Sequence, residues 1–239
     1  MEPNAVPGAA NRWIGKRVYK ALLGFDEAAR WFPAGRSETT GLPVRADFFR
    51  VTPKRSGVFT LLITGGSRGA RTLNRAARES WPLFVASGGG VRIVHQTGTT
   101  EHEALASEFA GTGLAGEVVP FLRDMPRAFA EADVVIARAG MSTISELAAA
   151  RMASVLVPFP FAADDHQRKN AEAVAQAAAA RVILDADLNG RKLFEQVEEL
   201  RHKPDDLDGM RERIQSFARP GAAERAADIL EEAAEAKRS

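Results

Sequence analysis

Residues 58–70 read Val-Phe-Thr-Leu-Leu-Ile-Thr-Gly-Gly-Ser-Arg-Gly-Ala, an apolar run that ends in a glycine-rich turn. Apolar residues on consecutive positions are typical of a strand that is buried on both faces, as strands of parallel sheets are. A helical pattern over residues 71–86 follows the turn directly. The stretch therefore predicts a strand over 58–64, a tight turn and a helix, which is the first unit of an α/β fold.

The same alternation of strand and helix continues to about residue 200. Further strands are expected at 91–95, 117–121, 133–137, 154–158 and 181–184, and further helices at 100–109, 124–131, 142–151 and 167–178. Right-handed crossovers between such strands produce a parallel sheet with helices on both faces. We expect residues 58–200 to form one Rossmann-like, doubly wound α/β domain, followed in residues 201–239 by two helices, 205–218 and 222–237.

Residues 1–57 differ in character from the rest of the chain. Residues 11–23 (Asn-Arg-Trp-Ile-Gly-Lys-Arg-Val-Tyr-Lys-Ala-Leu-Leu) have the pattern of a basic amphipathic helix, and residues 32–50 are rich in turns. The segment is too short to bury a core of its own, so we expect it to pack on the α/β domain or on a region outside this chain. The expected helix has two interpretations, contact with anionic lipid or ordinary core contact. The basic residues are Arg12, Lys16, Arg17 and Lys20, and the apolar ones are Trp13, Val18 and Leu22.

The composition excludes several classes of function. The 239 residues carry 32 Lys and Arg against 31 Asp and Glu, so a net charge of +1 makes nucleic acid a poor partner. The absence of Cys excludes disulfides, thiolate nucleophiles and Cys-based metal sites. No apolar run approaches the roughly 20 residues that a membrane-spanning helix needs. Nothing in the sequence indicates a metal or a cofactor.

The turn from Gly65 to Ala70 is suited to binding a phosphate. Small residues let backbone N–H groups approach an oxyanion, and the start of a helix adds a partial positive charge. The turn lacks the Gly-Lys-Ser/Thr ending of a nucleotide-triphosphate loop and the spacing of a dinucleotide fingerprint. A tight turn without a ligand is the alternative interpretation.

A second glycine turn, Arg138-Ala139-Gly140-Met141-Ser142-Thr143, also joins an expected strand to an expected helix. Glu146 lies one turn into that helix, where its carboxylate could accept hydrogen bonds from the vicinal hydroxyls of a ribose. In the alternative, Ser142 or Thr143 is an ordinary helix N-cap and Glu146 interacts with the helix dipole.

Two other groups of polar residues follow expected strands. The run Asp164-Asp165-His166-Gln167 could suggest a metal or a base, but adjacent side chains diverge, and Asp165 could simply cap the next helix. His95 could be catalytic, although a single His at a strand end is more often a structural hydrogen-bonding group. Several such turns at the carboxyl ends of parallel strands jointly predict a pocket for a nucleotide or a nucleotide sugar.

In order and spacing, these motifs closely resemble the MurG family of bacterial glycosyltransferases. The resemblance rests on Gly65–Ala70, His95-Gln96-Thr97-Gly98, Phe121-Leu122-Arg123-Asp124-Met125, Arg138 to Glu146, and Asp164–Gln167 with Lys169-Asn170-Ala171; Glu2-Pro3-Asn4 and Gly41-Leu42-Pro43-Val44-Arg45 extend it upstream. The family transfers N-acetylglucosamine from UDP-GlcNAc to lipid I, which gives lipid II for peptidoglycan. The resemblance implies a two-domain GT-B fold whose C-terminal domain holds the donor.

The resemblance also implies roles for individual residues. Ser67 and Arg45 would contact the diphosphate, the backbone at Leu122 would read uracil, and Glu146 would hold the ribose. Gln167, with Asp165 and His166, would hold the sugar, near Asn4. The second turn would face the phosphates, and the glycines would support both turns. The full set of implied UDP-GlcNAc-binding residues is Asn4, Arg45, Ser67, Leu122, Met141, Ser142, Thr143, Ile144, Ser145, Glu146 and Gln167, supported by Gly65, Gly66, Gly69, Gly140, Asp165 and His166.

The sequence departs from the family pattern in two respects. Leu42 stands where the family usually has Asn. The chain also starts where family members have already completed most of an N-terminal domain, so we expect the acceptor site and the general base to be missing. The expected protein is a donor-binding fragment, inactive alone, that lies at the cytoplasmic face of the cell membrane and serves cell-wall synthesis, cell shape and division. The alternatives are a non-catalytic UDP-sugar-binding module, one subunit of a split glycosyltransferase, or a related transferase or epimerase that uses another sugar.

Overall fold

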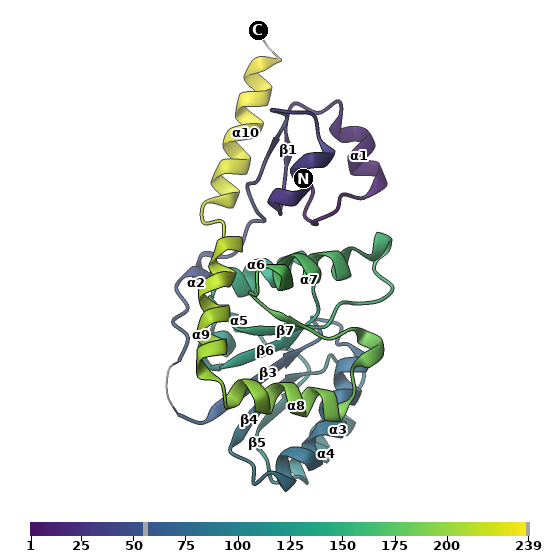
Figure 1. The fold of residues 1–239 in the computed structure, drawn as a ribbon, viewed down its shortest axis with the longest axis vertical. Coiled ribbons are helices and arrows are strands. Elements are labelled where there is room, and N and C mark those ends of the chain that lie inside the picture. The colour runs from purple at the N-terminus through teal and green to yellow at the C-terminus, as the bar shows by residue number, and fades with distance from the viewer. Residues whose placement is uncertain (55–56, 238–239) are drawn as a thin grey trace.

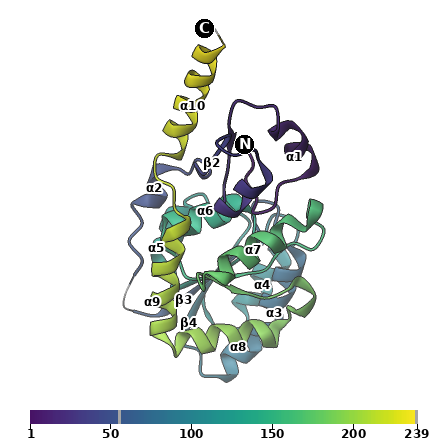
Figure 2. The same cartoon turned by 45° about the horizontal axis from the view of Figure 1, so that its top comes forward.

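The computed structural model describes residues 1–54 and 57–237. Its larger part is an α/β unit built on a single sheet, and its smaller part joins the N-terminal segment to the last helix, α10 (Ala222–Ala236) (Figure 1). In the turned view the last helix again lies beside the N-terminal segment (Figure 2). Arg225 of α10 donates hydrogen bonds to both carboxylate oxygens of Glu38, at 2.6 and 3.0 Å, and so ties the two ends of the chain together.

Within the described residues, the main sheet has six strands, all of them parallel, in the order β5-β4-β3-β6-β7-β8. They are β3 (Phe59–Thr64), β4 (Val91–Gln96), β5 (Ala115–Val119), β6 (Val134–Ala137), β7 (Ser154–Leu156) and β8 (Arg181–Val182). The expected doubly wound parallel sheet is confirmed. Thr64, the last residue of β3, pairs with Gln96 on one side and with Ala137 on the other. The turns that follow these three strands therefore emerge at the same edge of the sheet.

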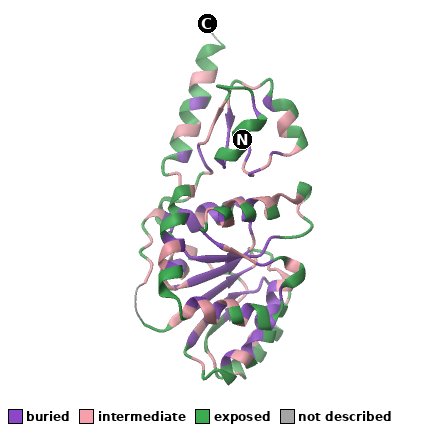
Figure 3. Ribbon diagram, viewed as in Figure 1, coloured by how far each residue is buried: buried purple, intermediate pink, exposed green. Residues whose placement is uncertain are grey.

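Helices cover both faces of the sheet, and the side chains of β3 alternate between two cores. Leu61 and Ile63 pack with α3, α4, α8 and α9, whereas Leu62 packs with α5, α6 and α7, and all three are fully buried. Figure 3 shows the buried residues concentrated in the strands and on the inner faces of these helices. The helices are α3 (Arg71–Ala86), α4 (His102–Ala110), α5 (Met125–Glu131), α6 (Met141–Ala149), α7 (His166–Gln176), α8 (Gly190–Arg201) and α9 (Pro204–Arg213). Tight 3₁₀ turns lie at Asp26–Trp31, Ala163–Asp165, Asp185–Asp187 and Ile214–Phe217.

The N-terminal segment does not contain the helix expected over residues 11–23. The helix there, α1 (Ala9–Gly15), is shorter, and β1 (Ala21–Leu22) pairs in parallel with β2 (Ser37–Glu38). Gly15 ends the helix where a Cβ would lie 2.3 Å from the ring of Phe32. Long-range pairing thus overrides the local helical pattern. A short helix, α2 (Ala46–Phe49), leads to the main sheet.

Most other expected elements are present, with shifted ends. The helix over 71–86 has the predicted bounds. Helix α8 was not among the expected elements. The strand predicted over 117–121 is β5 at 115–119, because Pro120 has no N–H to donate and the register with β4 starts at Ala115. The strands predicted over 154–158 and 181–184 are shorter at their carboxyl ends. None of the helices in the described ranges is long and apolar enough to cross a membrane.

Candidate functional site

A large cavity of about 1370 Å³ opens at the carboxyl edge of the sheet. It lies where the strand order reverses, between β3 and β6, which is the position at which open α/β sheets bind ligands. Eleven of the residues expected at the site line it. These are Arg45, Gly65, Gly66, Ser67, Gly69, Leu122, Gly140, Ser142, Thr143, Glu146 and Gln167.

The first glycine turn is held tightly against a neighbouring turn. Gly69 has a φ of +74°, and a Cβ on it would lie 1.9 Å from the carbonyl oxygen of Thr97. Only glycine permits this approach, because both the backbone conformation and the available space exclude a side chain. The turn therefore has one closely defined path, with Ser67 at the cavity wall.

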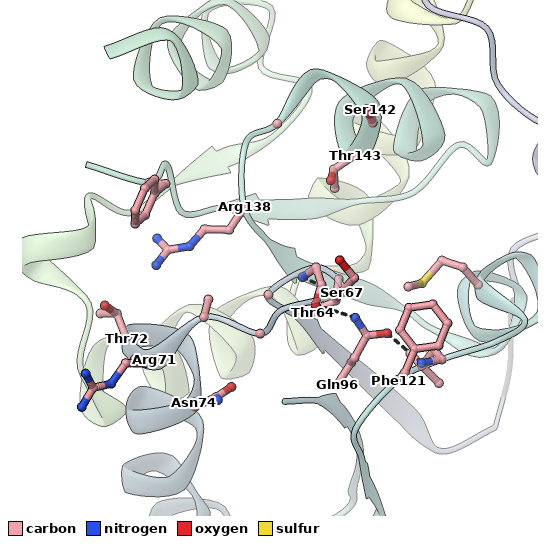
Figure 4. Close-up of a pocket in the computed structure, with 18 of the residues that line it drawn as sticks. Thr64, Ser67, Arg71, Thr72, Asn74, Gln96, Phe121, Arg138, Ser142 and Thr143 are labelled. Atoms are coloured by element: carbon pink, nitrogen blue, oxygen red, sulfur yellow. Dashed lines mark hydrogen bonds between the residues drawn. The ribbon is translucent and has the colours of Figure 1, made fainter. Parts of the chain in front are cut away.

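Two helix N-termini border the cavity. The residues at the N-cap positions of α3 and α6 are Ala70 and Gly140, and neither provides a side-chain cap. The first backbone N–H groups of both helices therefore lack the partner that a capping side chain supplies, and each helix adds about half a positive charge there. Figure 4 shows Ser67 on one side of the cavity and Ser142 and Thr143, in the first turn of α6, on the other. This arrangement suits an anion with two charged groups, such as a diphosphate.

The capping role considered for Ser142 or Thr143 is wrong, since Gly140 holds the N-cap position. Glu146 is half-buried on the same helix and lines the cavity. Burial raises the pKa of its carboxyl above the ordinary value, and the positive charge of Arg45 acts in the opposite direction. Arg45 itself lines the cavity and lies with its guanidinium 5.2 Å from the centre of the Phe48 ring. A carboxylate and a guanidinium thus face the same space.

Gln96 connects two walls of the cavity. Its Nε2 donates to the carbonyl oxygen of Gly66 at 2.8 Å, and its Oε1 accepts from the backbone N–H of Leu122 at 2.8 Å. The glycine turn after β3 and the segment after β5 are thereby joined through the last residue of β4, as the dashed lines in Figure 4 show.

The start of α7 and the residue before it contribute one of three expected residues to the cavity. Gln167 lines the cavity, and its Oε1 accepts from the backbone N–H of Phe159 at 3.0 Å. Asp165 and His166 do not line it. Asp165 occupies the N-cap position of α7 with a φ of +56° and makes no capping bond, so the side-chain cap considered for it is absent. His166 Nδ1 lies 2.7 Å from the carbonyl oxygen of Ala163.

Four other expected residues lie away from the cavity lining. Met141 and Ile144 are buried in the core beneath α6, and Ser145 is buried beside them. Among these, Met141 belongs to the first turn of α6, so its backbone N–H is one of those that the helix leaves unpaired. The Oδ1 of Asn4 accepts from Nδ2 of the buried Asn170 at 3.1 Å.

His95 has the structural role that the sequence favoured. It is fully buried, and its Nε2 lies 3.0 Å from Oδ1 of Asn74. Because the Asn74 amide nitrogen donates to the Thr97 carbonyl and to Glu101, Asn74 Oδ1 accepts and His95 Nε2 carries the proton. Burial lowers the pKa of His95 to about 3. His95 is not among the residues that line the cavity, so its imidazole does not face a ligand bound there.

The structure adds cavity residues that sequence reasoning did not assign. Arg138, at the end of β6, pairs with Asp185, which also accepts from the Thr72 hydroxyl at 3.1 Å. Phe121 and Phe159 contribute aromatic surface. Arg138 stands in the second glycine motif, so its place after a strand was the available signal, whereas Asp185 lies more than 40 residues away. In the described part of the chain, no three acidic or His side chains cluster closely enough to hold a metal.

Comparison with known proteins gives consistent results. Residues 60–230 match the family model described as the glycosyltransferase family 28 C-terminal domain. A UDP-N-acetylglucosamine--N-acetylmuramyl-(pentapeptide) pyrophosphoryl-undecaprenol N-acetylglucosamine transferase from Solibacter usitatus (strain Ellin6076) is 57% identical over 235 residues. That match covers 98% of this chain and 64% of the relative, so the chain spans less than two thirds of the relative's length.

Solved structures extend the comparison. The crystal structure of Acinetobacter baumannii MurG superposes with a TM-score of 0.79 at 32% identity, covering 97% of this chain and 66% of that one. A putative UDP-N-acetylglucosamine 2-epimerase from Listeria monocytogenes matches with a TM-score of 0.65 at 12% identity. That match covers 88% of this chain and 58% of the epimerase chain. The second likeness concerns the fold alone.

Proposed function

The chain belongs to glycosyltransferase family 28 through its C-terminal domain, and from that premise we propose that it forms the donor-binding part of a MurG-type N-acetylglucosaminyltransferase. The proposed donor is UDP-GlcNAc, and the proposed acceptor is lipid I. The product is lipid II, so the proposed activity serves peptidoglycan synthesis and, through it, cell shape and division.

The observation that carries this proposal is the pair of uncapped helix N-termini at the cavity. In an inverting transfer, the bond between the sugar's anomeric carbon and the diphosphate oxygen breaks as the acceptor oxygen attacks from the opposite face. The electron pair leaves with UDP, and the acceptor's proton passes to a base. Fixed N–H dipoles at the diphosphate stabilise the charge that develops on the leaving group. The described residues supply this leaving-group half of the reaction.

We assign the donor contacts as follows. Ser67 and Arg45 bind the diphosphate together with the starts of α3 and α6, Glu146 accepts hydrogen bonds from the ribose hydroxyls, and the backbone at Leu122 reads uracil. Gln167 binds the sugar. The position of all five at the cavity supports the assignment. For Asn4, Asp165 and His166, outside the lining, we propose an indirect role in shaping the sugar site.

Calorimetric titration with UDP and UDP-GlcNAc tests this proposal. Ser67→Ala and Glu146→Ala should each weaken UDP binding about tenfold or more, because each removes a hydrogen bond in which one group is charged, the diphosphate for Ser67 and the carboxylate for Glu146. Ser87→Ala, at the far end of α3, and Glu103→Ala, on the exposed face of α4, are matched controls and should bind as the wild type does. Absence of UDP binding by the folded wild type, or equal affinity in all variants, would contradict the proposal.

Transfer itself is a separate proposal, because the chain spans only 64% of its Solibacter relative. The second candidate is a UDP-sugar-binding module or a subunit that a partner completes, because the cavity residues assigned above concern the donor alone. Adding the N-terminal part of a relative in trans, with UDP-GlcNAc and a lipid I analogue, distinguishes the two. Transfer in that mixture supports the split enzyme, and donor binding without transfer supports the module.

We further propose that residues 9–31 contact the cytoplasmic face of the membrane. Trp13 is 65% exposed and Tyr19 49% exposed, and the guanidinium of Arg17 lies 4.8 Å from the centre of the Trp13 ring. Exposed aromatic and basic side chains together suit the interface of an anionic bilayer. Trp13→Ser should reduce sedimentation with anionic vesicles, whereas Val85→Ser, which removes an exposed apolar side chain on α3, should not. Equal sedimentation of both variants would contradict this surface.

A further inference from the structure

Gln96 is a buried polar residue of the cavity that the donor contacts above leave without a role. Its side chain is 1% exposed, and both ends of its amide are used. Nε2 donates to Gly66, the residue before Ser67, and Oε1 accepts from Leu122. Figure 4 shows this amide between the turn that carries Ser67 and the segment that begins with Phe121.

The two segments that Gln96 joins follow strands that are not neighbours. The order β5-β4-β3 places β4 between them, and Gln96 is the last residue of β4. One segment is the proposed diphosphate site and the other is the proposed base site. A side-chain amide with a donor on one end and an acceptor on the other can satisfy a carbonyl and an N–H at the same time. Its length therefore sets the separation of the two sites.

We propose that Gln96 is a positioning residue that fixes the base-reading segment relative to the diphosphate turn and thereby sets the preference for uracil. This inference rests on the proposed function. Because Gln96 Oε1 engages the Leu122 N–H, the orientation of that peptide is fixed, and with it the direction of the adjacent backbone groups. Uracil carries a hydrogen at N3 and cytosine does not, so a segment held in one orientation distinguishes UDP from CDP.

Gln96→Met tests the proposal, because it keeps a similar volume and removes both hydrogen bonds. We expect UDP affinity to fall about tenfold or more, and the ratio of UDP to CDP affinity to shrink towards one. The matched control is Thr97→Val. Thr97 is the next residue, is equally buried, and its hydroxyl donates only to the carbonyls of Gly98 and Val119. This control should leave the UDP-to-CDP ratio at its wild-type value.

Gln96→Glu tests the hydrogen bond to Gly66 apart from the one to Leu122. At alkaline pH, where the introduced carboxyl is ionised, it still accepts from the Leu122 N–H but cannot donate to Gly66, so one end of the bridge is lost. UDP affinity and the UDP-to-CDP ratio should then both fall, by less than in Gln96→Met. If Gln96→Met does not unfold cooperatively on heating, and so is not properly folded, the measurement on Gln96→Glu decides the question instead. If the wild type binds UDP and the Gln96 variants bind as tightly, or if Gln96→Met weakens UDP and CDP equally, the inference on Gln96 is wrong and the proposed function stands. If the folded wild type does not bind UDP, both are overturned.

Discussion

The path of the first glycine turn can be tested by adding a single methyl group at two of its positions. Gly66 and Gly69 have nearly equal φ values, +80° and +74°. An alanine at either position costs about 1–2 kcal/mol of stability, because L-residues disfavour this conformation. At Gly66 a Cβ would meet nothing within 4 Å, so Gly66→Ala should cost that amount and no more.

Gly69→Ala should be markedly worse. Its Cβ would lie 1.9 Å from the Thr97 carbonyl oxygen and 2.7 Å from the Thr97 carbonyl carbon, which are backbone atoms that cannot rotate away. Relief requires the turn to move, which adds about 1–3 kcal/mol. We therefore expect a total loss of about 2–5 kcal/mol for Gly69→Ala, against about 1–2 kcal/mol for Gly66→Ala.

Urea unfolding followed by circular dichroism gives the free energies, and UDP titration of the same samples reports on the site. Gly69→Ala should also lose UDP affinity, because the displaced turn carries Ser67. The reasoning would be refuted if the two variants were equally stable, or if Gly69→Ala retained wild-type stability and affinity.

Three further predictions concern buried charge. Since the pKa of His95 is lowered to about 3, the folded protein binds this proton more weakly than the unfolded chain, so stability should fall as the pH falls from about 6.5 towards 3. The urea midpoint should therefore depend less steeply on pH in His95→Gln than in the wild type. An equal pH dependence of the two midpoints would contradict this prediction. Since burial raises the pKa of Glu146, the contribution of this carboxyl to stability is lost as the pH rises above the ordinary pKa of Glu. In urea unfolding, Glu146→Gln should be more stable than the wild type near neutral pH and no more stable in acid. The opposite order would show that burial does not disfavour the charged form of Glu146. Asp185→Ala leaves the largely buried Arg138 without its charged partner and should lower the free energy of unfolding by about 3 kcal/mol in urea titrations. A loss below about 0.5 kcal/mol, as at an exposed ion pair, would disprove the role of this pair.

The core of the fold was accessible from sequence because its signals are local. Residues 71–86 follow a glycine turn, Ser87 and three consecutive glycines come after them, and the helix has the predicted bounds. The strands were recognisable as apolar runs, although their ends depend on pairing partners, as the shift of β5 to 115–119 shows. The helix expected over 11–23 failed for the same reason, because residues 21–22 pair with residues 37–38.

The candidate site was predictable where a motif adjoins a strand end. Ser67, Thr143 and Glu146 follow β3 and β6 and reach the cavity as expected. Arg138 and Asp185 are far apart in sequence, so their pairing could not be read from the sequence. The link from Gln96 to Gly66 and Leu122 likewise depends on the order of three strands.

We propose that the cleft at the carboxyl ends of β3 and β6 binds the diphosphate of a uridine nucleotide sugar. A crystal structure of the chain with UDP-GlcNAc tests this most directly. We expect the diphosphate between Ser67 and the first turn of α6, the ribose hydroxyls within hydrogen-bonding distance of Glu146, and uracil beside Leu122. A nucleotide bound elsewhere, or bound in the cleft with its diphosphate away from both helix N-termini, would contradict it.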